Sequence, residues 1–144
     1  KKILEKYVSL VILIALPIVI FSFFFAEPII SLLFGPEYLP GVATFKILIF
    51  TILIVYPSTL IGNAIFAYDQ HKAFLKFSLS AIAGNIAFNA LLIPIFGIEG
   101  AAISTVVTQL ITNILIWHKM KTINNFSVWP EIKRQITSML KLTS

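Results

Sequence analysis

The sequence contains no cysteine, so disulfide bonds, thiolate metal sites and cysteine nucleophiles are excluded. Charged residues are scarce as well. They make up 12% of the chain, whereas soluble globular proteins contain roughly 25%. A soluble domain of 144 residues needs more polar surface than these side chains can build. The composition, with 58% hydrophobic residues, therefore argues against a soluble globule and for a membrane protein.

Acidic, basic and histidine residues are missing from four long stretches of the chain. These stretches are residues 7–26, 47–68, 77–98 and 100–117. A helix needs about 20 apolar residues, with a range of roughly 17–25, to cross the hydrocarbon core of a bilayer. The sequence therefore predicts an all-α fold, an integral membrane bundle of four transmembrane helices within residues 1–121.

The charges between these stretches are unevenly distributed. Ten of the eleven basic residues lie before the first stretch, between the second and third, and after the fourth; only Lys46 lies elsewhere. By the positive-inside rule, this pattern predicts a multi-pass protein of the bacterial cytoplasmic (inner) membrane with both termini in the cytoplasm. The positive excess is then explained by anionic lipid, and no nucleic-acid partner is expected. Because the chain begins with Lys1 and lacks an initiator Met, we expect it to be a fragment.

Two segments outside the predicted spans have helical patterns of their own. Residues 28–34 are apolar but too short to cross a bilayer, which predicts a short interfacial helix that ends at the Gly35-Pro36 turn. In the tail, residues 122–144, Pro130 and Glu131 mark a helix start. The apolar residues that follow share one helical face, which predicts either a cytoplasmic amphipathic helix or the start of a further span: Ile132, Ile136, Met139 and Leu140.

No group of residues resembles an enzyme active site. His71 and His118 flank predicted spans without an acid or a nucleophile at useful spacing. Asp69 and Glu99 lie in connections, and no predicted span contains the buried acid that proton or sodium coupling would require. We therefore expect no enzyme activity, no cofactor and no metal.

Uncharged polar residues inside the spans are the remaining candidates for a functional site. Asn85 and Asn89 are four residues apart and share a helix face, and Thr105, Gln109 and Asn113 repeat at the same spacing in the last span. Amides in hydrocarbon need partners, so these side chains should face protein or a wet cavity. They either form hydrogen bonds between helices, each worth about 0.6 kcal/mol on average, or line the path of a polar substrate.

Small residues and a proline mark the connection between the third and fourth spans. Pro94, Gly97 and Gly100 predict a tight turn between two helices. Gly97, Ala101 and Thr105 are four residues apart, a spacing of small side chains that allows close helix packing in membranes.

Three motifs together resemble a known family. They are "EPIISLLFGPEYLPG", "GNAIFAYDQHK" and "NIAFNALLIPIFGIEGAAIST". In order and spacing, they are similar to the C-terminal region of bacterial polysaccharide-biosynthesis flippases of the multidrug/oligosaccharidyl-lipid/polysaccharide exporter superfamily. The resemblance covers about residues 7–117, and the last motif is its most specific part.

This resemblance implies a transporter of two lobes that moves lipid-linked oligosaccharide across the cytoplasmic membrane by alternating access. The chain would supply four helices of the second lobe. Its partners would be membrane lipid, the lipid-linked oligosaccharide and the remaining lobe, which would hold the cations for the lipid pyrophosphate because the predicted spans contain none. Two alternatives stay open: a drug/cation antiporter of the same superfamily, and a small four-helix membrane scaffold protein.

Overall fold

The computed structural model describes residues 1–142, and every regular element in that part of the chain is helical. The predicted all-α class is therefore confirmed. The last two residues of the predicted tail, 143 and 144, lie outside the described residues. The elements are α1 (Lys2–Phe24), α2 (Ala26–Phe34), the 3-10 helix η1 (Pro36–Gly41), α3 (Val42–Leu48), α4 (Thr51–Ala67), α5 (His71–Asn124) and α6 (Trp129–Leu142).

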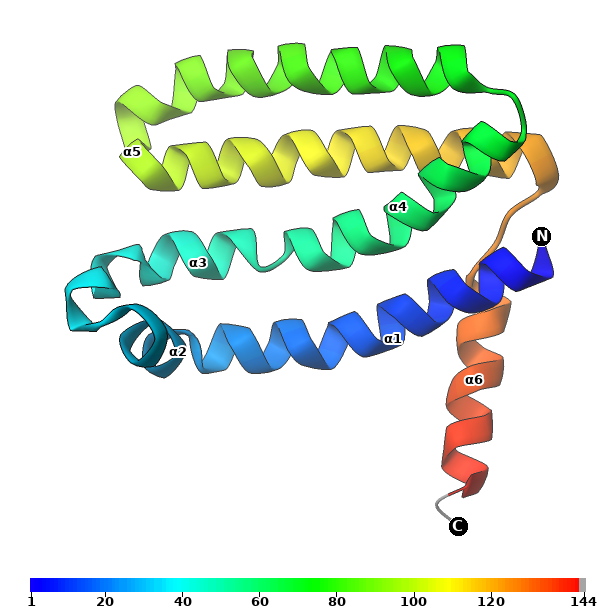
Figure 1. Ribbon diagram of the computed structural model, residues 1–144, viewed down its shortest axis with the longest axis horizontal. Coiled ribbons are helices and arrows are strands. Elements are labelled where there is room, and N and C mark those ends of the chain that lie inside the picture. Colours follow the sequence, from blue (N-terminus) through cyan, green and yellow to red (C-terminus); the bar gives the residue numbers. More distant parts are fainter. Residues whose placement is uncertain (143–144) are drawn as a thin grey trace.

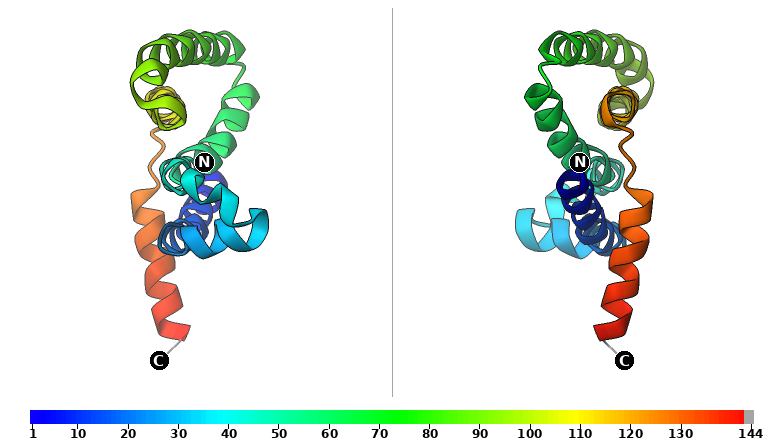
Figure 2. Two further views of the ribbon diagram at one scale, coloured as in Figure 1. Left: turned by 90° about the vertical axis from the view of Figure 1, so that its left-hand side faces the viewer. Right: turned by 90° about the vertical axis from the view of Figure 1, so that its right-hand side faces the viewer.

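The long helices lie side by side in alternating directions (Figure 1). α1 runs one way, α3 and α4 return, and α5 doubles back on itself, so its two arms are antiparallel. We call residues 71–96 the first arm of α5 and residues 98–124 the second arm. α6 runs across α1 rather than along it, as the two side views also show (Figure 2).

The reversal inside α5 occurs at Gly97. Its backbone has φ 57° and ψ −133°, a conformation that residues with a Cβ rarely adopt. Three residues later, a Cβ on Gly100 would collide with the carbonyl oxygen of Leu92, so the chain closes tightly there. Pro94, just before the turn, cannot donate a helical hydrogen bond, so it weakens the helix next to the reversal. The structure thus contains the turn that the glycine and proline pattern predicts.

Four spans are predicted, whereas among the described residues two helices, or three if a bent pair counts as one, are long and apolar enough to cross a membrane. α1 and α5 are each long and apolar enough, and residues 36–48 with α4 form a third candidate that is bent by 44°. The bend follows α3 and falls inside the predicted span 47–68. There Thr51 Oγ1 donates a hydrogen bond to the carbonyl oxygen of Leu48 over 2.6 Å, which satisfies an acceptor that the interrupted helix leaves open.

α2 corresponds to the short helix predicted over residues 28–34. It ends at Gly35, whose φ of 105° is a backbone conformation that glycine adopts readily and other residues rarely do. Leu32 is 86% exposed and Leu33 69% exposed, so the helix presents apolar side chains outward at the end of the bundle. This exposure is what an interfacial helix requires.

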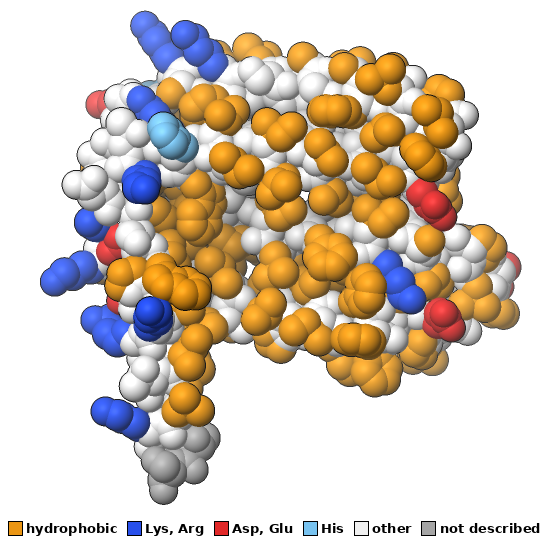
Figure 3. Space-filling model, turned by 180° about the vertical axis from the view of Figure 1, so that it is seen from behind, with side chains coloured by type: hydrophobic (Ala, Val, Ile, Leu, Met, Phe, Trp, Pro, Cys, Tyr) orange, Lys and Arg blue, Asp and Glu red, His pale blue; other side chains and the backbone are white. Residues whose placement is uncertain are grey.

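The larger of two buried hydrophobic clusters lies at the end of the bundle where α1 starts, and a smaller one of Ala26, Ile30 and Val42 joins α2 to α3. In the larger cluster, the first turns of α1 pack with the ends of α4 and α5 and with the linker to α6. Elsewhere large apolar side chains cover the surface, as the space-filling view shows (Figure 3). The larger cluster consists of Val8, Ile61, Ile65, Ile116, Met120, Phe126 and Val128.

Basic side chains are concentrated at one end of the bundle. The start of α1, both ends of α5 and α6 carry ten basic residues, and all of these segments meet at one end. Glu27, Glu37 and Glu99 lie in the segments at the opposite end, together with Lys46. Figure 3 shows most of the blue side chains gathered at one edge, red ones at both edges, and a largely apolar surface between the two edges. The sequence pattern therefore corresponds to a real polarity of the folded chain.

Candidate functional site

A polar cleft lies between α4 and the two arms of α5. It has a volume of about 320 Å³, near the lower end of the roughly 300–1,000 Å³ of small-molecule sites. We call it the α4–α5 cleft. Apolar side chains form part of its wall, and its polar lining consists of Ser58, Thr59, Asn63, Ser78, Gln109, Thr112 and Asn113.

Two of the predicted path residues, Gln109 and Asn113, lie in this cleft. Both are on the second arm of α5, one helical turn apart. Asn113 is 7% exposed, and its Nδ2 donates to the Gln109 carbonyl oxygen over 2.6 Å and lies 3.3 Å from Gln109 Oε1. The two amides are therefore held in place while Gln109 remains half-buried at the cleft wall.

Opposite them, Ser58 joins α4 to α5. Trp117 Nε1 donates a hydrogen bond to Ser58 Oγ over 2.8 Å, although the two residues are 59 positions apart. Ser58 is 3% exposed. Beyond this contact, a second hollow of about 310 Å³ is lined by apolar side chains and by Ser58, Asn113 and Trp117. Ser58 and Asn113 line both hollows and so separate a polar cleft from an apolar one.

Asn85 and Asn89 lie outside the α4–α5 cleft, in the seam between the two arms of α5. Asn89 Nδ2 donates to Asn85 Oδ1 over 2.9 Å. Ser104 Oγ on the second arm donates to the backbone carbonyl oxygen of Asn85 over 3.3 Å. Asn89 Oδ1 is buried, and no partner for it is found among residues 1–142. The structure therefore divides the predicted polar set into a cleft pair and a seam pair.

The small residues of the second arm also differ from the predicted stripe. Ala101 and Thr105 are half-buried, and Thr105 Oγ1 donates within its own helix to the Ala101 carbonyl oxygen over 2.9 Å. The fully buried positions are Gly100, Ser104 and Thr108, which have the same four-residue spacing on an adjacent face. Close contact between the arms therefore depends on a neighbouring row of small side chains.

The side chains that α4 contributes to the cleft lay largely outside the predicted set. Ser58, Thr59 and Asn63 complete the polar lining from α4. Thr59 and Asn63 are four residues apart, a spacing that places them on one helix face. This spacing could have identified them, but only the packing of α4 against α5 shows that their face meets Gln109 and Asn113.

Lys46 lies between the first two predicted spans in the sequence, and the structure places it in a helix. It lies in α3, inside the bent candidate span, rather than in a loop before a span. Its Nζ is 5.6 Å from the centre of the Phe23 ring, a distance at which a cation is attracted to the ring face. The bent candidate span thus includes one cation, within its first turns.

Comparisons with known proteins find relatives that match most of the chain. The chain is similar to a capsular polysaccharide biosynthesis protein. This relative, CapF of Staphylococcus aureus, is 32% identical over 123 residues, which are 85% of the chain and 31% of the relative. An uncharacterised membrane protein of Methanocaldococcus jannaschii is 32% identical over 122 residues, 84% of the chain and 24% of that protein.

The chain therefore spans less than a third of the length of either relative. No family model matches it, and no solved structure matches it. The membrane protein among the relatives and the long apolar helices together indicate membrane location.

The chemistry available in the α4–α5 cleft is hydrogen bonding. Its described lining contains hydroxyl and carboxamide groups and no acidic, basic or histidine side chain. Such groups both donate and accept hydrogen bonds, as polar uncharged ligands require. The cleft is thus suited to contacts with a neutral polar molecule that passes along or rests in it.

Proposed function

We propose that the chain is part of a transporter that flips lipid-linked oligosaccharide across the cytoplasmic membrane for surface polysaccharide synthesis. The observation that carries this proposal is the neutral polar cleft within an otherwise apolar bundle. Sugars offer many hydroxyl groups. A wall of Ser, Thr, Asn and Gln side chains can bind these hydroxyl groups through hydrogen bonds, without ion pairs. The polysaccharide-related name of one relative supports the same substrate class.

The proposal includes four membrane crossings with both termini in the cytoplasm. It counts α1, the bent pair of α3 and α4, and each arm of α5 as one crossing. Support comes from the reversal at Gly97 and from the ten basic residues at one end of the bundle. The basic end would face the cytoplasm by the positive-inside rule.

The chain would act with further helices of the same transporter. It spans less than a third of each relative, and much of its lateral surface consists of exposed apolar side chains. A remaining lobe and membrane lipid would cover this surface, and the lipid-linked oligosaccharide would pass between the lobes by alternating access. In this role the chain is a carrier rather than an enzyme, and it needs no cofactor.

The decisive experiment replaces the amides of the cleft in the full-length protein. Gln109→Leu with Asn113→Leu removes two hydrogen-bonding groups from the wall, and we expect surface polysaccharide to fall several-fold. Gln70→Leu is a matched control, because it changes an amide outside the cleft. Normal polysaccharide at unchanged protein level in the double variant would show that the cleft is not the substrate path.

A further inference from the structure

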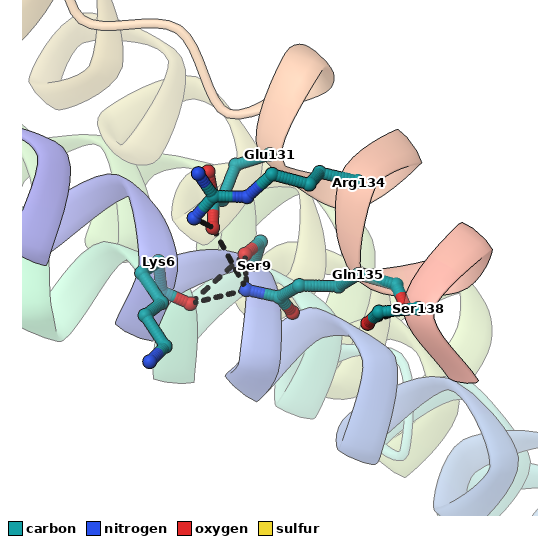
Figure 4. A network of polar contacts seen from close by, with 6 residues as sticks. All are labelled: Lys6, Ser9, Glu131, Arg134, Gln135 and Ser138. Atoms are coloured by element: carbon teal, nitrogen blue, oxygen red, sulfur yellow. Dashed lines mark hydrogen bonds and ion pairs between the residues drawn. The ribbon is translucent and has the colours of Figure 1, made fainter. Parts of the chain in front are cut away.

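α6 is attached to the bundle by a polar contact with α1 (Figure 4). Gln135, 8% exposed, donates through Nε2 to Ser9 Oγ over 2.7 Å and to the Lys6 carbonyl oxygen over 3.1 Å. Just before α6, the backbone N–H of Ser127 donates to Glu5 Oε1 over 2.9 Å. These contacts hold α6 against the first turns of α1, at the basic end of the bundle.

The contact places α6 across the bundle axis (Figures 1 and 2). If α1 crosses a bilayer, a helix that runs across its end lies along the membrane surface. The position is consistent with α6 being a surface helix and not the start of a span that continues into the bilayer beside α1.

The two sides of α6 differ sharply in chemistry. Trp129 is 65% exposed and Met139 47% exposed, and the space-filling view shows apolar side chains along the side of α6 that faces the length of the bundle (Figure 3). Basic side chains lie on the other side, away from the apolar surface. This is the arrangement of a helix that rests in a membrane interface, with its apolar face toward the hydrocarbon.

The charges favour an anionic leaflet. α6 has three basic residues and one acidic residue, Glu131, which pairs with Arg134 over 2.6 Å. Lys133 Nζ lies 5.5 Å from the centre of the Trp129 ring, and Trp is enriched at membrane interfaces. The rest of the basic end adds to the same positive surface.

We propose that α6 is a lipid-binding element that lies flat on the membrane and binds anionic phospholipid headgroups. Its apolar side enters the interface, Lys133 and Lys141 contact the headgroups, and the Gln135 contact keeps the helix at the end of α1. The proposal requires that α1 crosses the membrane. It does not depend on oligosaccharide transport, so it stands or fails separately from the proposed function.

The test uses single cysteines in the full-length protein, with any cysteine outside this chain replaced. Residues 1–144 contain none, so each label site is unique within them. Met139→Cys and Thr137→Cys place a spin label on opposite sides of α6. Oxygen and a water-soluble nickel chelate then report lipid and water exposure in vesicles of phosphatidylcholine, with and without phosphatidylglycerol.

In vesicles with phosphatidylglycerol, we expect the label at 139 to be lipid-exposed and the label at 137 to be water-exposed. Lys133→Gln with Lys141→Gln should lower the equilibrium constant for lipid binding by α6 by about fivefold per charge, as expected for basic side chains near an anionic surface. Lys72→Gln with Lys76→Gln removes the same charge at the start of α5, outside α6, and should change the label at 139 much less.

Three outcomes would overturn the proposal. Equal lipid exposure of the labels at 137 and 139 would show that α6 is embedded as a span. Water exposure at both positions would show that α6 is not on the membrane. The same lipid exposure at 139 with and without phosphatidylglycerol would show that anionic lipid is not what α6 binds.

Discussion

Trp117 on the second arm of α5 donates its indole N–H to the hydroxyl of Ser58 on α4, over 2.8 Å. The two residues are far apart in the sequence, and Ser58 is almost fully buried. This hydrogen bond fixes the distance between the two helices that form the α4–α5 cleft. Together with the packing of Ile61 and Ile65 against Ile116 and Met120, this contact sets the geometry of the proposed substrate path.

Ser58→Ala removes this hydrogen bond and leaves the indole N–H without its acceptor. We expect a loss of about 0.6–2 kcal/mol in unfolding free energy, the size found for hydrogen bonds between membrane helices. Unfolding in mixed detergent measures it. Ser80→Ala is the control because Ser80 is exposed on the first arm of α5; an equal loss in both variants would contradict a specific role for the Ser58 contact.

Gly100→Ala should damage the hairpin of α5 more than Gly84→Ala. A Cβ at position 100 would collide with the backbone carbonyl oxygen of Leu92, whereas one at position 84 would lie 3.9 Å from Thr108 Cγ2, an ordinary contact. Overpacking typically costs about 1–3 kcal/mol, so the first variant should unfold at lower denaturant and the second should resemble the wild type. Similar stability of the two variants would show that the turn has another geometry.

Asn85 and Asn89 should show strong coupling. Asn85→Leu alone leaves the Asn89 amide without the acceptor that it has in the structure, and we expect a loss of about 1–3 kcal/mol. The double change to Leu removes both partners and should cost less than the sum of the single changes. If the double variant is stable but surface polysaccharide falls, the pair serves transport; if both are normal, the pair has only a packing role.

The orientation of the bundle can be tested with an impermeant thiol reagent on intact cells. Glu99 lies in the turn of α5 and Asp69 in the connection between α4 and α5, at opposite ends of the bundle. With the basic end in the cytoplasm, Glu99→Cys should react from outside, and Asp69→Cys should react only after permeabilisation. The reverse pattern would place both termini outside.

Local properties of the sequence were sufficient to predict the helical class, the turn at Gly97 and the concentration of basic side chains at one end. Long apolar runs can satisfy the hydrogen bonds of their backbone groups in a bilayer only as helices or closed barrels. A reversal of the chain that needs a positive φ is most easily made by Gly. Each of these features is set by residues close together in the chain.

Features that depend on which helix faces which were decided by the tertiary structure. Asn85 and Gln109 have the same kind of side chain, but one lies in the seam of α5 and the other in the cleft against α4. The crossing of α6 over α1 also results from contacts between distant segments. Hydropathy along a single chain defines a helix and its ends, whereas the partner of each face is chosen by packing between helices, which a one-dimensional pattern does not contain.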